Sequence, residues 1–244
     1  MRKIISFFLL LSSQAYIYAG ESNLAIPQLS QGQNILLEFG LAVCFLGILF
    51  GLYQFKRVKN MLAHKSMLEV ADTIWETCKT YLRQQAKFLF ALFLIIAVVS
   101  AFYFGVLSHI SVGGVLLILL WTVLGILGSS SVALYGMRMN TLANARTAFA
   151  GLEGKPLKTI NVALDAGMSV GVFLVCIELI MMLIILLFVP RDLAGNSFIG
   201  FAIGESLGAS ALRIAGGIFT KIADIGSDLM KIVFKIKEDD PRNP

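Results

Sequence analysis

The chain has 244 residues, of which 57% are hydrophobic and only 14% are charged, and its mean hydropathy is +0.82. Soluble domains carry about 25% charged and about 45–50% apolar residues, so this composition excludes a disordered chain, a disulfide-stapled secreted module and a cytosolic enzyme. The three cysteines, Cys44, Cys78 and Cys176, are too widely spaced to form a metal-binding or disulfide pattern. The composition therefore indicates an integral membrane protein.

The N-terminus has the pattern of a secretory signal peptide over residues 1–20. Arg2 and Lys3 precede the apolar run ISFFLLL, and small residues follow at positions 19–20. The apolar run is too short to span a bilayer comfortably, so we expect cleavage, with a retained N-terminal anchor as the alternative. The polar segment 21–33 is then the mature N-terminus, outside the cytoplasm.

Five apolar stretches are long enough to cross a membrane at about 20 residues per helix. They lie near residues 35–55, 88–108, 111–136, 167–189 and 196–220. Residues 88–137 contain no Asp, Glu, Lys or Arg, and Gly113 and Gly114 mark a tight hairpin between two of the spans. We therefore predict an all-α fold, a polytopic transmembrane helix bundle with five spans.

The basic residues predict the orientation of the bundle. They gather in the connections 56–87 and 138–165 and in the segment 221–244, and cytoplasmic loops are the ones enriched in Lys and Arg. We therefore place the mature N-terminus outside and residue 244 in the cytoplasm, in the inner membrane of the cell. The spacing of apolar residues in 60–86 predicts an amphipathic helix at the cytoplasmic interface. The net charge of +5 reflects this topology and does not indicate a nucleic-acid partner.

The fifth span continues into a charged helix face. Arg213, Lys221, Asp224 and Asp228 fall within roughly 80° of one another at about 100° per residue, and Lys231 lies on the same face. Glycines that would let other helices approach closely lie on the same helix, at Gly204, Gly208, Gly216 and Gly217.

Two interpretations of this face stay open from the spacing alone. The first is a solvated helix with the pairs Lys221–Asp224 and Asp228–Lys231, each contributing a few tenths of a kcal/mol. The second is a metal–phosphate site, because two carboxylates with substrate phosphates are a usual Mg²⁺ environment and a lysine one turn away supplies a positive charge.

Several motifs resemble one family, the membrane-bound ion-pumping pyrophosphatases. GGIFTKIADIGSDL at 216–229, followed by EDDPRNP at 238–244, is similar to that family's lysine–aspartate motif and acidic loop. GMRMNTLANARTA at 136–148 and MLEVADTIWETCKTYLRQQ at 67–85 are similar to two earlier stretches of the family. The resemblance covers most of residues 35–244.

The resemblance implies Mg²⁺-dependent hydrolysis of inorganic pyrophosphate coupled to outward transport of H⁺ or Na⁺, in a homodimer, with K⁺ as a possible activator. Lys221 would then contact pyrophosphate, and Asp224 and Asp228 would help to hold Mg²⁺. Arg213 would belong to the ion gate.

The resemblance also assigns Glu238 and Asp239 to the acidic loop of the active site. Family subunits have roughly sixteen helices and continue into a further aspartate-rich segment after this loop, so the chain resembles an N-terminal part that is inactive alone. The alternative is a non-enzymatic membrane subunit or scaffold. The residues do not indicate which ion is pumped.

Overall fold

The computed structural model describes residues 26–27, 29–237 and 240, and the predicted signal segment 1–20 lies outside the described residues. The described chain folds into long helices with no strand among them, which confirms the prediction of an all-α bundle. In order they are α2 (Gln31–Lys59), α3 (Lys65–Ala101), the π-helix η2 (Phe102–Leu107), α4 (Val112–Gly151), α5 (Pro156–Phe188) and α6 (Arg191–Phe234).

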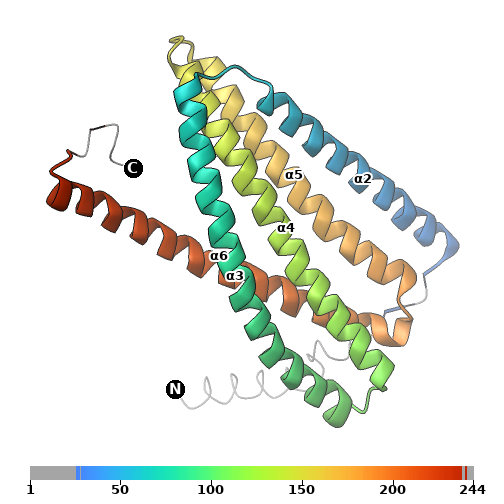
Figure 1. Ribbon diagram of the computed structural model, residues 1–244. Helices are drawn as coiled ribbons and strands as arrows, with labels where there is room; N and C mark the ends of the chain where they lie inside the picture. Colours follow the sequence, from blue (N-terminus) through green and yellow to red (C-terminus); the bar gives the residue numbers. More distant parts are fainter. Residues whose placement is uncertain (1–25, 28, 238–239, 241–244) are drawn as a thin grey trace, which may run out of the picture.

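Helix α4 is the centre of the bundle. It contacts each of the other four α-helices, and its largest interface is with α6. Helices α2 and α5 pack against each other, α3 packs on α4, and α6 crosses the bundle at a steep angle (Figure 1). Of the described helices, α4 buries the most residues, among them Ile118, Trp121 and Met139.

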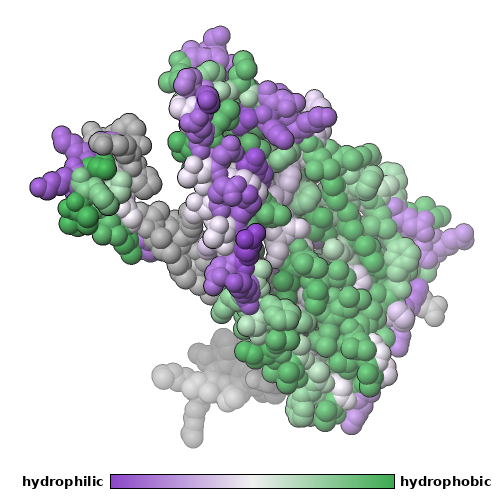
Figure 2. Space-filling view, in the orientation of Figure 1, coloured by the Kyte–Doolittle hydropathy of each residue, from purple (hydrophilic) through white to green (hydrophobic). Residues whose placement is uncertain are grey.

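Four helices, α2, α3 with η2, α4 and α5, are long and apolar enough to cross a membrane. Figure 2 shows their apolar side chains as a broad surface, with hydrophilic residues gathered toward one end of the bundle. The chain is thus a multi-pass membrane protein. Among the described helices, α6 is not one of these four, so the fifth span at 196–220 stays a prediction.

The helices extend well past the apolar stretches. The two basic connections expected at 56–87 and 138–165 are mostly helical, and the non-helical parts are only 60–64 and 152–155. The amphipathic stretch is therefore continuous with the apolar part of α3 and is not a separate interfacial helix. The reason is local, because positions 65–104 contain no glycine or proline to interrupt the helix.

The helix ends follow the sequence. Ser30 forms a capping box with Gln33 at the start of α2, and Ser111 caps α4 by accepting a hydrogen bond from the Gly114 amide at 3.3 Å. The hairpin predicted between the second and third spans is present, and His109 turns the chain there with φ 53°.

A polar cluster joins three helices inside the apolar part of the bundle. The Tyr135 hydroxyl donates to the Gly51 carbonyl at 2.8 Å, and Ser169 donates to the same carbonyl at 3.1 Å. The Tyr135 ring stacks on Phe173 with centroids 4.3 Å apart. Because hydrocarbon offers no competing hydrogen-bond partner, these contacts hold α2 against α4 and α5.

Two arginines fix the hydrophilic end of α4. Arg138 lies 4.9 Å above the Trp75 ring and 3.7 Å from the Asp72 carboxylate, both on α3. Arg146 is buried and donates to the Lys59 carbonyl at the end of α2 at 2.6 Å. The hydrogen bond from Arg146 to the Lys59 carbonyl holds the C-terminal end of α2 against α4.

Candidate functional site

Helix α6 is held against α4 by glycines. An ideal Cβ on Gly204 would lie 1.9 Å from the Thr122 carbonyl oxygen, and one on Gly208 would lie 2.9 Å from the Ser129 Cβ. The prediction that these two glycines permit close helix contact is confirmed. An ideal Cβ on Gly217 has no neighbour within 4 Å among the described residues, and Gly216 falls outside the residues whose surroundings are described.

The C-terminal half of α6 leaves the bundle and projects away from the other helices (Figure 1). Arg213 is exposed where this half begins. Further along, the side chains of Lys221, Asp224 and Asp228 are 80%, 69% and 67% exposed. The structure therefore keeps the predicted residues on one continuous helix and leaves them accessible.

The charged groups pair along the helix. Lys221 Nζ lies 3.8 Å from an Asp224 carboxylate oxygen, and Lys231 Nζ lies 3.8 Å from an Asp228 oxygen. These are the two i,i+3 pairs expected from the spacing. Both distances are long for a hydrogen-bonded ion pair, so the carboxylate oxygens keep coordination sites that another cation can use.

The donor chemistry of this face fits a hard divalent cation. Asp224 and Asp228 are one helical turn apart and offer four exposed carboxylate oxygens, the ligand type that Mg²⁺ takes together with substrate phosphates and water. Two carboxylates are an incomplete shell, and the described residues contain no group of three His, Cys, Asp or Glu side chains that could hold a metal. Glu238 and Asp239, predicted to join the site, lie outside the described residues.

The fold and the charged face define a class, a polytopic helical membrane protein that carries an exposed lysine–aspartate motif on an extended helix. A family model described as inorganic H⁺ pyrophosphatase matches residues 45–244. The chain belongs to this family, which confirms the resemblance drawn from the motifs.

Relatives with curated names support the same family. The chain is 60% identical over 206 residues to a K⁺-insensitive pyrophosphate-energized proton pump of Chlorobaculum tepidum, an alignment that covers 84% of this chain and 28% of the relative. It is 32% identical over 189 residues to a pump of the same name in Methanosarcina mazei, covering 77% of this chain and 26% of the relative.

A further relative, from Clostridium tetani, is named a putative K⁺-stimulated pyrophosphate-energized sodium pump and is 31% identical over 187 residues, covering 76% of this chain and 26% of the relative. The chain therefore spans only about a quarter of the length of these three relatives. No solved structure matches the chain.

Proposed function

We propose that this chain is the N-terminal part of a pyrophosphate-energised ion pump, which hydrolyses inorganic pyrophosphate to two phosphates and moves H⁺ out of the cytoplasm. The observation that carries the proposal is the 60% identity with a proton pump over most of this chain. That relative supports H⁺ over Na⁺ as the transported ion, since the relative named as a sodium pump is only 31% identical.

In this proposal the exposed face of α6 contributes one wall of the active site. Lys221 binds a phosphate oxygen of pyrophosphate, and Asp224 and Asp228 hold Mg²⁺, which neutralises charge on the phosphates when it is bound. All three side chains are exposed. Their exposure supports this assignment, because side chains that bind a substrate must stay accessible once the chain has packed. Glu238 and Asp239 extend the acidic part of the site.

The same helix couples hydrolysis to transport. Arg213 lies eight residues before Lys221, about 12 Å along a helix that rises 1.5 Å per residue. Because α6 is continuous from Arg191 to Phe234, a displacement of Lys221 on substrate binding is transmitted to Arg213. The full protein forms a homodimer in the inner membrane, with the mature N-terminus outside and residue 244 in the cytoplasm. The relative that is 60% identical is named as K⁺-insensitive, which argues against the K⁺ activation that the resemblance implied.

The experiment is hydrolysis and ion transport by the full-length gene product in inverted membrane vesicles. Phosphate release is followed together with acidification of the vesicle lumen. Asp224→Asn and Asp228→Asn are each expected to lower the rate of Mg²⁺-dependent hydrolysis by about 100-fold or more. This is the size of the rate loss when one electrostatic contact that stabilises the transition state is removed. Residues 1–244 expressed alone are expected to release no phosphate.

The matched control for these variants is Glu69→Gln on α3. Glu69 is 68% exposed and pairs with Lys65 at 3.9 Å, so it has almost the same exposure and pairing as Asp228 without belonging to the proposed site. Unchanged hydrolysis in both aspartate variants would refute the site.

Arg213→Ala tests the gate separately. We expect it to retain hydrolysis and to lose acidification. Fully coupled pumping in this variant would contradict the role of Arg213 and leave the hydrolytic site intact.

A further inference from the structure

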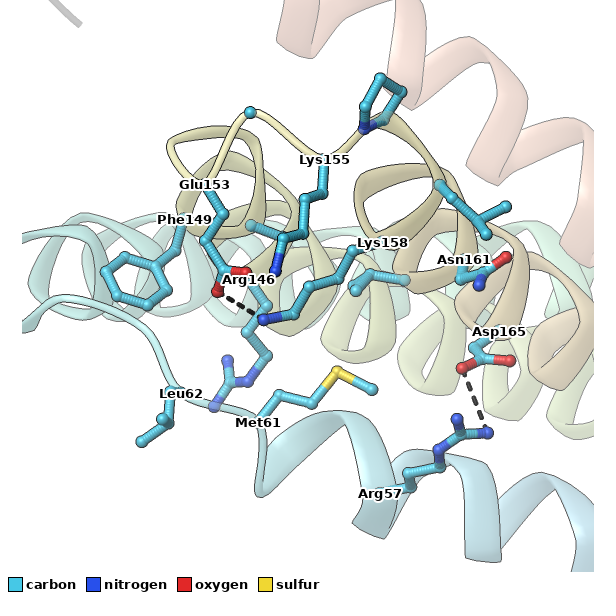
Figure 3. Close-up of a pocket in the computed structure, with 15 residues that line it drawn as sticks. Arg57, Met61, Leu62, Arg146, Phe149, Glu153, Lys155, Lys158, Asn161 and Asp165 are labelled. Atoms are coloured by element: carbon cyan, nitrogen blue, oxygen red, sulfur yellow. Dashed lines mark hydrogen bonds and ion pairs between the residues drawn. The ribbon is translucent and has the colours of Figure 1, made fainter.

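A large cavity lies at the end of α2, away from the charged face of α6. Helix α2 ends at Lys59, whereas α4 continues to Gly151 and α5 begins at Pro156. The space left beyond α2 is a cavity of about 780 Å³ (Figure 3). We call it the α2 notch, and among its lining residues are Arg57, Met61, Arg146, Lys155, Leu157 and Asp165.

The notch carries more positive than negative charge. Arg57 pairs with Asp165 at 3.3 Å, and Lys158 pairs with Glu153, which leaves Arg146 and Lys155 as cations in excess. No ion pair joins Lys155 to another side chain in the described part of the chain. The lining therefore favours an anion.

One donor in the notch is buried and unused. Arg146 is only 6% exposed, and two of its nitrogens donate hydrogen bonds to the Leu142 and Lys59 carbonyls. Its Nε has no hydrogen-bond partner in the described part of the chain. A buried, unpartnered N–H of a guanidinium is costly, and Arg146 lines the notch, so an anion bound there would lie next to this buried positive group.

An apolar stripe leads from the notch toward the membrane. Leu157, Ile160, Leu164 and Met168 follow one another at helical spacing along α5 and are 72%, 53%, 55% and 55% exposed. Leu157 lines the notch, and Met168 lies inside the predicted span 167–189. The exposed stripe therefore joins an anion-favouring cavity to the hydrocarbon region.

We propose that the α2 notch binds the phosphate headgroup of an anionic phospholipid, with an acyl chain of that lipid lying along the α5 stripe. The notch lies where α2 ends its apolar stretch in Lys56, Arg57 and Lys59, which is the level at which basic side chains meet lipid headgroups. A free phosphate ion would use the cations and leave the apolar stripe without a role.

The test is native mass spectrometry of the full-length gene product, released from nanodiscs that contain equal amounts of phosphatidylglycerol and phosphatidylcholine. Phosphatidylglycerol is expected to stay bound in preference. Lys155→Gln and Arg57→Gln are each expected to lower its retention about fivefold, the effect of about 1 kcal/mol per basic side chain near lipid headgroups. Leu157→Asn is expected to lower the retention of both lipids.

Two controls match these variants in kind. Lys87→Gln removes an exposed cation from α3 next to the predicted span 88–108, outside the notch. Leu152→Asn removes an apolar side chain that is 73% exposed, against 72% for Leu157, and that does not line the notch. Both controls are expected to retain lipid as the unchanged protein does.

Three outcomes would overturn the proposal. The first is equal retention of the two lipids, and the second is an equal loss of retention in the control variants. The third is displacement of phosphatidylglycerol by inorganic phosphate at millimolar concentration, which would make the notch a site for a free anion. Because Lys155 is an exposed residue without an ion pair, its variant is expected to fold, and the test does not depend on Arg57→Gln.

Discussion

The crossing of α4 and α6 gives the sharpest stability prediction. A methyl group added by Gly204→Ala would lie 1.9 Å from the Thr122 carbonyl oxygen, 2.8 Å from its carbonyl carbon and 3.0 Å from its Cα. All three atoms are backbone, so no side-chain rotation relieves the clash. Ordinary contact begins near 3.4 Å, and α6 must therefore move away from α4 along much of the interface.

The expected cost follows from two opposing terms. Overpacking of a close interface costs about 1–3 kcal/mol, or more where the neighbour cannot rotate. Replacing glycine by alanine inside a helix favours folding by about 0.8–1.0 kcal/mol in water. Because the clash at Gly204 is with backbone, we expect the first term to exceed the second and the variant to lose about 1–2 kcal/mol or more.

Thermal unfolding of the detergent-solubilised full-length protein measures this loss. Gly171→Ala is the matched control, because Gly171 lies in the apolar part of α5 and an ideal Cβ there meets nothing within 4 Å in the described structure. We expect Gly204→Ala to lower the unfolding temperature and Gly171→Ala to leave it equal or higher. Equal unfolding temperatures for the two variants would refute the close contact between α4 and α6.

Three further predictions concern α2 and its neighbours. Tyr135→Phe removes the 2.8 Å hydrogen bond to α2 and keeps the ring stack, so it should cost about 1 kcal/mol and lower the unfolding temperature; an unchanged temperature would contradict the cluster. The thiol of Cys44 on α2 interacts with that of Cys176 on α5. Oxidation with copper-phenanthroline should therefore join the two in a disulfide, which would protect them, and not Cys78, from maleimide labelling after denaturation. A hydrogen bond from Lys158 holds the pKa of Glu153 below its ordinary value, so the carboxylate stays charged as pH falls through the ordinary range of a glutamate. Because this carboxylate is charged at neutral pH, Glu153→Gln should release Lys158 from its ion pair and raise the retention of phosphatidylglycerol at that pH. Lower retention would contradict the role of the notch.

The sequence predicted the helices better than it predicted their boundaries. Apolar runs identified the four helices that can span a membrane, since hydrocarbon permits few other structures. Hydropathy, however, measures where a helix leaves the bilayer and not where it ends. The continuity of α3 from Lys65 to Ala101 was therefore missed, although the absence of glycine and proline in 65–104 was a usable signal.

The polar sites of the chain were likewise predicted only in part from the sequence. The pairs Lys221–Asp224 and Asp228–Lys231 are local to one helix, so their spacing was enough to predict them. The α2 notch was not predicted, because it joins residues more than a hundred positions apart, such as Arg57 and Asp165. No periodicity within one segment brings such residues together.

The arrangement of α6 connects the stability argument to the proposed pump. Its N-terminal half is fixed to α4 at Gly204, and its C-terminal half, with Lys221, projects from the bundle. These two residues are seventeen positions apart, about 25 Å along a helix. Since α6 has no break between them, a small tilt at the glycine crossing becomes a larger displacement at Lys221. A variant that loosens the crossing, such as Gly204→Ala, should therefore weaken the coupling of hydrolysis to transport as well as the stability of the fold.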